Sequence, residues 1–252
     1  MHPGARFSDP AELYDLIYGF KDYASEAARV RQILHDNGIA DGSRVMEGAC
    51  GTGAYLGPLS KHFVVSGYDL DPGMVAVARR RAPRATLWVG DLLDATPDEP
   101  VDAAIVLFGG LAYVHPEPQL ATACRTLFAS LLPGGVALVE PWLTPQDHTE
   151  HTVQMAVVDL PYLKVARQCV PVRQGDLLTL DFHYLVARPG MAVEHITESN
   201  ALYLYTLDAW MRCLRGAGFE VALTDQGFMP EKRLFVCRRP GDLRSLQERD
   251  DL

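Results

Sequence analysis

Between residues 44 and 142, short apolar runs alternate regularly with segments that carry helix signals. The runs are RVMEGA, FVVSGYDL, ATLWVGD, DAAIVLF and VALVEPW. Helices are predicted between them over 54–61, over 71–82 with Pro72 in the first turn, and over 116–132, where a Pro-Gly-Gly turn closes the helix. DAAIVLF is mostly apolar, as a strand buried on both faces should be. This alternation predicts an α/β fold with a doubly wound, mostly parallel sheet and right-handed crossovers.

The alternation stops after Trp142. Residues 152–205 show no helical period and indicate strands separated by turns, which predicts an antiparallel β insertion at about 145–205. A helix over 206–218 and two closing strands follow. We expect a single domain over 1–252 that carries this insertion as a lid or an oligomer surface.

Composition excludes several classes of protein. The chain has 252 residues and a net charge of −9, which argues against a nucleic-acid partner. Its apolar runs are too short to span a bilayer, so no membrane partner is expected. The first residues, MHPGARFSDPAELY, lack the apolar core of a secretory signal peptide.

Cysteine and histidine spacing points to neither disulfides nor a metal. The five cysteines lie far apart and form no CxxC pair, which is typical of reduced thiols in a cytoplasmic protein. His148 and His151 are three residues apart, but a pair without a third ligand does not make a metal site. We therefore expect no metal.

The stretch VMEGACGTGAY, residues 45–55, ends the first predicted strand in glycines. A dinucleotide fingerprint would need glycine at 51, 53 and 56, but position 56 is Leu. A phosphate loop would need Gly-Lys-Ser/Thr, which is also absent. The strand delivers a carboxylate, Glu47, just before the loop, and a carboxylate suits a ligand with a cationic group better than a pyrophosphate.

Two further acids follow the next strands. Asp69 ends the second strand and can accept both hydroxyls of a ribose. Asp91 follows the third strand and can accept from an adenine amino group. Three successive strands therefore end in acids on the rim where open α/β sheets bind ligands. An adenosine with a positive, amino-acid-like tail satisfies all three, and S-adenosylmethionine fits that description.

Four motifs in order, VMEGACGTG, GYDLDPGM, GDLLD and LLPGGVALVEPW, resemble the class I S-adenosylmethionine-dependent methyltransferases. The resemblance covers about residues 10–142 and resumes near 206–238. It implies a seven-stranded sheet whose seventh strand is antiparallel to the rest. The cofactor contacts that it implies are Glu47, Ala49, Cys50 (through its backbone), Gly51, Asp69, Leu70, Met74, Asp91, Leu92 and Phe108, with Leu70, Met74 and Leu92 around the adenine.

The start AELYDLIYGFKDYASEA, with EPW and a late RLFV, is similar to the enzymes that N-methylate amino sugars in antibiotic biosynthesis. That likeness places Tyr14 against cofactor and substrate and Tyr23 at the cofactor carboxylate. Those enzymes carry a histidine where this chain has Tyr113. Candidate catalytic residues are Tyr14, Tyr18 and Tyr113, and candidate substrate contacts are Tyr18, Phe108, Tyr113, Trp142 and His195. His115 and His183 are further candidates for a base.

These patterns predict transfer of a methyl group from S-adenosylmethionine to an amine nitrogen of a small molecule, an amino-sugar-like intermediate. An alkyl amine with a pKa near 10 is mostly protonated at neutral pH, so the site needs a base or a dry pocket. Glu140 either holds the acceptor amine or bonds backbone. The alternatives are an O-methyltransferase, a nicotinamide-dependent oxidoreductase and a non-catalytic module. We also expect a homo-oligomer formed through the β insertion.

Overall fold

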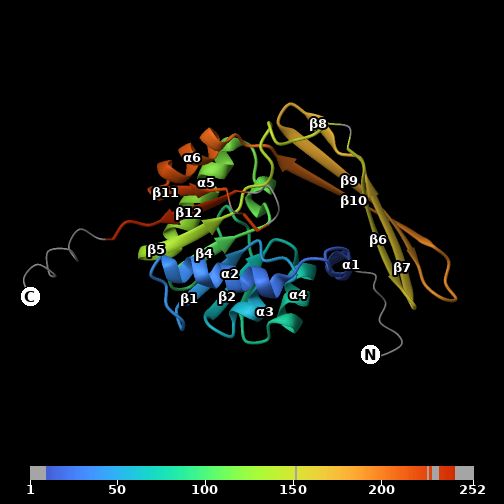
Figure 1. The fold of residues 1–252 in the computed structure, drawn as a ribbon, viewed down its shortest axis with the longest axis horizontal. Helices are drawn as coiled ribbons and strands as arrows, with labels where there is room; N and C mark the ends of the chain where they lie inside the picture. The colour runs from blue at the N-terminus through green and yellow to red at the C-terminus, as the bar shows by residue number, and fades with distance from the viewer. Residues whose placement is uncertain (1–9, 151, 226, 229–232, 242–252) are drawn as a thin grey trace, which may run out of the picture. The chain divides into compact units, whose positions relative to one another are not determined.

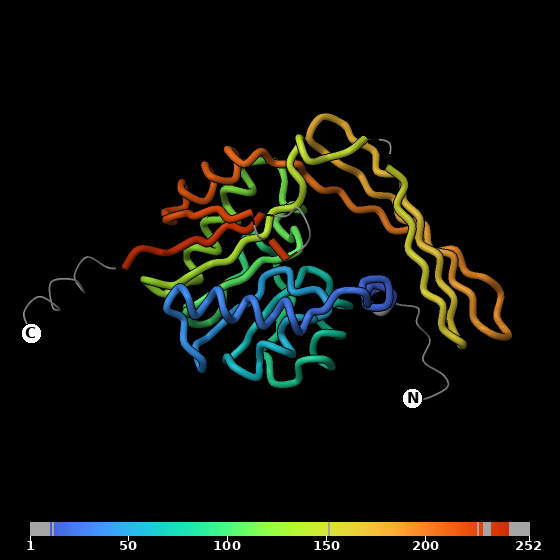
Figure 2. Tube along the Cα trace, in the orientation of Figure 1, coloured from blue at the N-terminus to red at the C-terminus, as the bar shows by residue number. Residues whose placement is uncertain are grey.

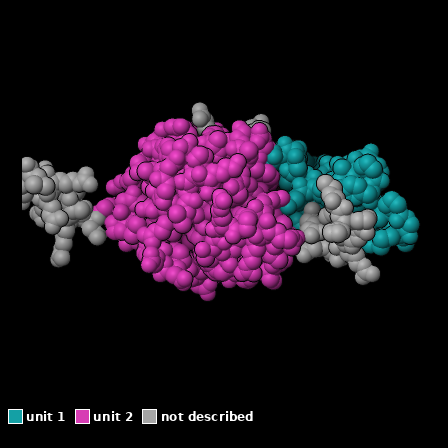
Figure 3. All heavy atoms as spheres, turned by 90° about the horizontal axis from the view of Figure 1, so that it is seen from below, with its two compact units in different colours: residues 1–21, 143–205 teal, residues 22–142, 206–252 magenta. Residues whose placement is uncertain are grey.

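The computed structural model describes residues 10–150, 152–225, 227–228 and 233–241. The chain divides into two compact units, which Figure 3 colours separately. Unit 1 takes Met1–Lys21 and Leu143–Tyr205, and unit 2 takes Asp22–Trp142 and Thr206–Leu252. The β insertion thus groups with the first residues of the chain, and a single-domain organisation stays a prediction.

Unit 2 is built on a seven-stranded sheet with the order β11-β12-β5-β4-β1-β2-β3. All neighbouring strands are parallel except β12, which is antiparallel to both β5 and β11. This confirms the predicted fold class and the antiparallel closing strand. The strands are β1 (Arg44–Gly48), β2 (Val64–Asp69), β3 (Thr86–Val89), β4 (Val101–Val106), β5 (Leu131–Val139), β11 (Glu220–Thr224) and β12 (Leu234–Arg238).

Helices cover both faces of this sheet. Figures 1 and 2 show α2, α3 and α4 on one face and α5 and α6 on the other. Their bounds are α2 (Tyr23–Asp36), α3 (Leu56–Leu59), α4 (Pro72–Arg81), α5 (Glu117–Ala129) and α6 (Leu207–Gly216), with a 3-10 turn η1 (Gly110–Tyr113) after β4. The N-caps were predictable: Asp71 accepts the Gly73 N–H before α4, and Thr206 accepts the Ala209 N–H before α6.

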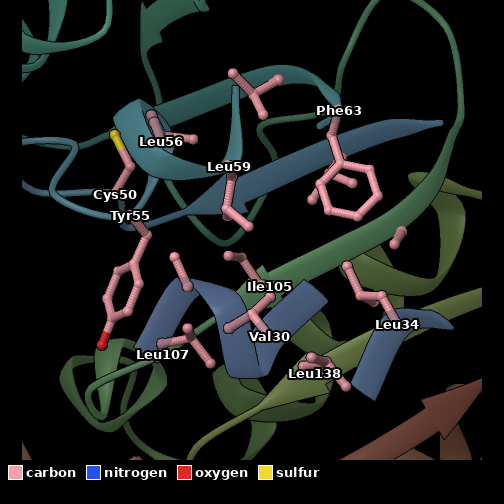
Figure 4. Close-up of a cluster of buried hydrophobic side chains, with 14 of the residues drawn as sticks. Val30, Leu34, Cys50, Tyr55, Leu56, Leu59, Phe63, Ile105, Leu107 and Leu138 are labelled. Carbon is pink, nitrogen blue, oxygen red and sulfur yellow. The ribbon is translucent and has the colours of Figure 1, made fainter. Parts of the chain in front are cut away.

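The core on the first face joins α2 to the sheet. Val30 and Leu34 of α2 are fully buried and pack with Ile105 and Leu138 of the central strands, as Figure 4 shows. Burying one such side chain contributes about 1.5–3 kcal/mol. This packing holds α2 against the central strands β4 and β5.

Two predicted boundaries were wrong. The helix predicted over 54–61 spans only Leu56–Leu59, because the glycines before it form turns instead. The helix predicted over 116–132 ends at Ala129, and β5 already begins at Leu131. The Pro-Gly-Gly turn lies inside that strand, where the register against β4 shifts and Gly134 has φ +83°.

Unit 1 contains the predicted antiparallel insertion. Its strands run in the order β10-β9-β7-β6, with β8 paired to β9. They are β6 (Gln154–Leu160), β7 (Leu163–Cys169), β8 (Val172–Gln174), β9 (Leu177–Ala187) and β10 (Glu194–Tyr203). The helix α1 (Pro10–Ile17) packs beside β6 and buries Leu13 and Ile17.

Candidate functional site

The three predicted acids lie on one rim of the unit 2 sheet. Strands β1, β2 and β3 are consecutive neighbours and run parallel, so their carboxyl ends meet at the same edge. Glu47 is the penultimate residue of β1, Asp69 ends β2, and Asp91 comes two residues after β3. Ligands of open α/β sheets bind at this edge.

The chain leaves β1 through a turn of left-handed residues. Ala49, Gly51 and Gly53 have φ angles of +51°, +53° and +70°. A Cβ on Gly53 would lie 3.0 Å from the Ala78 Cβ, whereas a Cβ on Gly51 would meet nothing within 4 Å. Left-handed Ala49 stores about 1–3 kcal/mol of strain, and such strain concentrates at ligand sites. The turn thus presents open backbone at Gly51.

Glu47 is the most unusual group on the rim. Its side chain is only 3% exposed, and its Oε2 has no hydrogen-bond partner among the described residues. Burial, and then the charge of Asp69, raise the pKa of Glu47 well above its usual range. A buried carboxylate oxygen that accepts no hydrogen bond from the described residues and lies near a second acid favours a cationic ligand.

Asp69 is tied to the glycine turn by backbone hydrogen bonds. It accepts the N–H groups of Gly51 at 2.8 Å and of Asp71 at 3.0 Å. Burial raises its pKa, while these two bonds act in the opposite direction. Each carboxylate oxygen has two acceptor positions, so Asp69 retains capacity for ligand hydroxyls. Asp91 similarly accepts the Leu93 N–H at 2.9 Å through Oδ1.

Apolar residues border these acids. Leu70 is 68% exposed directly after Asp69, and Met74 and Leu92 are half-buried. A Cβ on Gly48 would lie 3.1 Å from Leu92 Cδ2, so the glycine lets Leu92 pack against the end of β1. An exposed leucine beside two half-buried apolar side chains offers a surface for a flat aromatic ring.

The exit of β4 carries a second strained turn. Phe108 has φ +54°, and Gly109 has φ +73°. The Phe108 ring meets Trp142 edge-on at 5.8 Å, and a Cβ on Gly109 would lie 2.8 Å from Trp142 Cε3. Tyr113, at the end of η1, is 52% exposed. The predicted Phe108 and Trp142 are therefore brought together.

Glu140 has a structural partner on each side. Its carboxylate accepts the Phe108 N–H at 2.8 Å and the Phe228 N–H at 2.7 Å. Of the two roles expected for Glu140, the structure shows the bonding to backbone. Phe228, absent from the expected site, is 88 residues away in the sequence, and no local signal points to it.

Tyr55 and Cys50 complete the glycine stretch. The Tyr55 hydroxyl donates a hydrogen bond to Glu26, and the Tyr55 ring meets Tyr23 edge-on at 5.1 Å. This pair links α2 to the glycine turn and was not expected from the sequence. The Cys50 thiol is buried, which raises its pKa, and its N–H donates to the Tyr68 carbonyl at 2.9 Å.

Three predicted residues lie in unit 1. The Tyr14 and Tyr18 rings are 4.5 Å apart, and Arg167 stacks over Tyr18 at 5.1 Å. His195 lies on exposed β10, where its Nε2 is 3.0 Å from His183 Nδ1. Contacts of these residues with cofactor or substrate stay predictions. His151, of the histidine pair considered for metal, lies outside the described residues.

Comparison with known proteins decides the family. A family model described as "Methyltransferase domain" matches residues 45–135. The dTDP-3-amino-3,6-dideoxy-alpha-D-glucopyranose N,N-dimethyltransferase of Streptomyces fradiae is 34% identical over 243 residues, which is 95% of this chain and 94% of that protein. The chain belongs to the S-adenosylmethionine-dependent amino-sugar N-methyltransferases.

Other members agree. The dTDP-3-amino-3,4,6-trideoxy-alpha-D-glucopyranose N,N-dimethyltransferase of Streptomyces venezuelae is 32% identical and covers 87% of this chain and 93% of its own. The S-adenosylmethionine-bound structure of CalS10, an amino pentose methyltransferase from Micromonospora echinaspora involved in calicheamicin biosynthesis, has a TM-score of 0.81 at 27% identity, over 95% of this chain and 100% of its own.

The activity follows from this membership. The enzyme uses S-adenosylmethionine and transfers a methyl group to an amine nitrogen. The nicotinamide-dependent and non-catalytic alternatives are thereby set aside. Among the helices of the described residues, none has the length and apolar character needed to cross a membrane.

Proposed function

We propose that the enzyme N-methylates the amino group of a dTDP-linked deoxyamino sugar, adding two methyl groups, in the biosynthesis of an antibiotic. The likeness to the Streptomyces fradiae N,N-dimethyltransferase, which spans nearly the whole of both chains, carries this proposal. The Streptomyces venezuelae relative, whose name also specifies a 3-amino sugar, favours an amino group at carbon 3.

The rim residues fit the cofactor. S-adenosylmethionine supplies a methyl group already activated by a positively charged sulfur. Glu47 offers to the cofactor's ammonium group a buried oxygen that is unbonded within the described part of the chain. Asp69 takes the ribose hydroxyls and Asp91 the adenine amino group, while Leu70, Met74 and Leu92 contact the adenine.

Backbone and aromatic groups complete the proposed cofactor site. Ala49, Cys50 and Gly51 contribute main chain from the left-handed turn, which approaches a ligand closely because a Cβ at Gly51 meets open space. Tyr23, fixed by its edge-on contact with Tyr55, reaches the cofactor carboxylate. The family resemblance adds Tyr14, whose ring face would stabilise a sulfonium by about 0.5–2 kcal/mol.

The acceptor contacts begin at the exit of β4. Phe108 and Trp142 form an aromatic wall, and the hydroxyl of exposed Tyr113 accepts the proton of the acceptor amine while its own proton passes to solvent. The family resemblance adds Tyr18 and His195 as residues that contact the acceptor. Tyr14 and Tyr18 remain candidate catalytic residues. The protein's task is to hold the amine nitrogen in line with the methyl group, which contributes roughly 7–11 kcal/mol.

The test is incubation of purified enzyme with S-adenosylmethionine and a panel of dTDP-linked 3-amino and 4-amino sugars. Mass spectrometry should find two added methyl groups on nitrogen of a 3-amino sugar. Methylation on oxygen would favour an O-methyltransferase and defeat the proposal. Replacement of the Tyr113 hydroxyl, in Tyr113→Phe, should lower kcat by about 10²-fold or more, the low end of acid–base catalysis, with cofactor affinity unchanged.

We also propose that the enzyme is cytoplasmic and that it forms a homo-oligomer through the β insertion. One face of the insertion sheet carries large exposed apolar side chains on β6, on β9 and just before β10: Met155, Val157, Leu185 and Val193 are 51–64% exposed. Val157, Leu185 and Val193 line a hollow of about 300 Å³ together with Asp159 and Lys164. A second copy would cover this face, and Leu185→Glu should then shift the mass measured by light scattering to that of a monomer. A wild-type monomer would refute the proposal.

A further inference from the structure

Glu140 lies at the carboxyl end of β5 and bonds two segments, one after β4 and one between β11 and β12. It directly follows β5, which lies between β4 and β12 in the sheet. Its own N–H still donates to the Val106 carbonyl at the end of β4. The side chain is 1% exposed, so almost no water reaches it.

Each oxygen of the Glu140 carboxylate serves a different neighbour. Oε2 accepts the Phe108 N–H from the exit of β4, and Oε1 accepts the Phe228 N–H from the β11–β12 loop. Residues 227 and 228 also contact α2, where Arg29 donates to the Gly227 carbonyl at 2.8 Å and lies 5.0 Å over the Phe228 ring.

The bond to Phe108 acts at the strained turn. A non-glycine residue at φ +54° persists only where its surroundings fix it, and the Glu140 carboxylate is the group that holds its N–H. Phe108 in turn sets the edge-on contact with Trp142 at 5.8 Å. The orientation of the Phe108 and Trp142 rings therefore depends on the Glu140 carboxylate.

We infer that Glu140 is a positioning residue for methyl transfer: its two oxygens lock the Phe108 backbone and the Phe228 backbone in one geometry around the acceptor. The inference rests on the proposed acceptor site at Phe108 and Trp142. Bringing amine and methyl group into line is the enzyme's main contribution, and a misplacement of about 1 Å can cost 10²-fold in rate.

The test compares Glu140→Gln with Asp102→Asn. Glutamine keeps one acceptor oxygen but turns an NH₂ group towards the other backbone N–H, so one of the two segments is released. Asp102 is a matched control because its carboxylate also accepts a backbone N–H, from Arg44 at 2.8 Å, at the opposite end of β4.

Five quantities are measured on both variants: kcat, the acceptor KM, the Kd of S-adenosylhomocysteine, Tm, and amide exchange by mass spectrometry. Glu140→Gln should lower kcat about 10- to 100-fold and speed exchange in the peptides that hold Phe108 and Phe228. Its Kd for S-adenosylhomocysteine should change less than kcat, because Glu140 bonds Phe108 but none of the three acids Glu47, Asp69 and Asp91. Asp102→Asn keeps an amide oxygen that can accept the single N–H of Arg44, so it should leave kcat within about twofold.

Two results would overturn the inference. One is a folded Glu140→Gln enzyme that keeps wild-type kcat. The other is that Asp102→Asn lowers kcat as much as Glu140→Gln does when the two variants have lost the same Tm. If the wild type methylates no dTDP-linked amino sugar, the acceptor proposal fails. The exchange measurement then still decides whether Glu140 holds both segments, since unchanged exchange at Phe108 and Phe228 refutes the lock.

Discussion

Glu47→Gln should change cofactor affinity and the stability of the cofactor-free enzyme in opposite directions. The substitution replaces one carboxylate oxygen by NH₂ at nearly constant volume. In the free enzyme the carboxyl is 3% exposed and lies near Asp69, and burial followed by that charge raises its pKa. Glutamine cannot ionise, so the substitution removes the cost of burying a charge in the free enzyme. It also removes the carboxylate that would bind the cofactor's ammonium group.

The sign of the stability effect follows from proton linkage. A group whose pKa is higher in the folded state contributes stability that is full below its unfolded pKa, about 4.3, and is lost as the pH rises through the folded pKa. Glu47 therefore destabilises the free enzyme progressively above pH ~4. In Glu47→Gln this pH-dependent loss is absent, so its Tm should rise relative to wild type as the pH increases from about 4 to neutral.

The affinity effect has a definite size. A hydrogen bond to a charged group contributes about 1.5–3 kcal/mol, so Glu47→Gln should weaken S-adenosylhomocysteine binding about 10- to 150-fold. The ammonium group favours the ionised carboxylate, so wild-type binding should release protons. Calorimetry in two buffers with different ionisation enthalpies measures that release, which Glu47→Gln should largely abolish.

Asp102→Asn is again the control, because it removes a carboxylate that bonds Arg44 far from the rim. It should lower Tm and leave the affinity within about twofold. The reasoning is refuted if Glu47→Gln binds S-adenosylhomocysteine as tightly as wild type. It is also refuted if the free variant shows the wild-type dependence of Tm on pH.

Two further substitutions test the turns. Cys50→Ala should leave the Kd of S-adenosylhomocysteine within about twofold, because Cys50 contributes its backbone to the site while its thiol is buried and neutral. A tenfold loss of affinity measured by calorimetry would contradict this. Gly109→Ala should lower the unfolding free energy by about 1–3 kcal/mol in denaturant titration, since its φ is +73° and the new Cβ would lie 2.8 Å from Trp142 Cε3. Gly134→Ala is the control, because Gly134 has φ +83° but its new Cβ would meet no atom within 4 Å, so it adds backbone strain alone. If both variants lose the same unfolding free energy, the close contact with Trp142 costs nothing.

The fold was predictable because its signals are local. Apolar runs of strand length and caps such as Asp71 and Thr206 are readable within a few residues. The start of β5 was missed because Pro-Gly-Gly is usually a turn between elements, whereas here a bulge against β4 absorbs it within the strand. Only pairing with a neighbouring strand shows the difference.

The positions of the site residues were predictable to a similar degree. Glu47, Asp69 and Asp91 lie at or just after the end of a strand, and parallel pairing places such positions on one rim. The partners of Glu140 were not predictable, because Phe228 reaches it from 88 residues away. The Arg167 bond to the Tyr18 hydroxyl spans 149 residues and was missed for the same reason.

The strand order also constrains how the enzyme is made. β12 lies between β5 and β11 in the sheet, but the ribosome makes the whole β insertion before it makes β12. At about 5–20 residues per second, the ribosome needs on the order of 5–20 s to go from the end of β5 to Arg238. During that time β5 is an open sheet edge, the kind of surface that recruits strands from other chains. Slow translation or chaperone depletion should therefore harm the yield of this enzyme before it harms its activity.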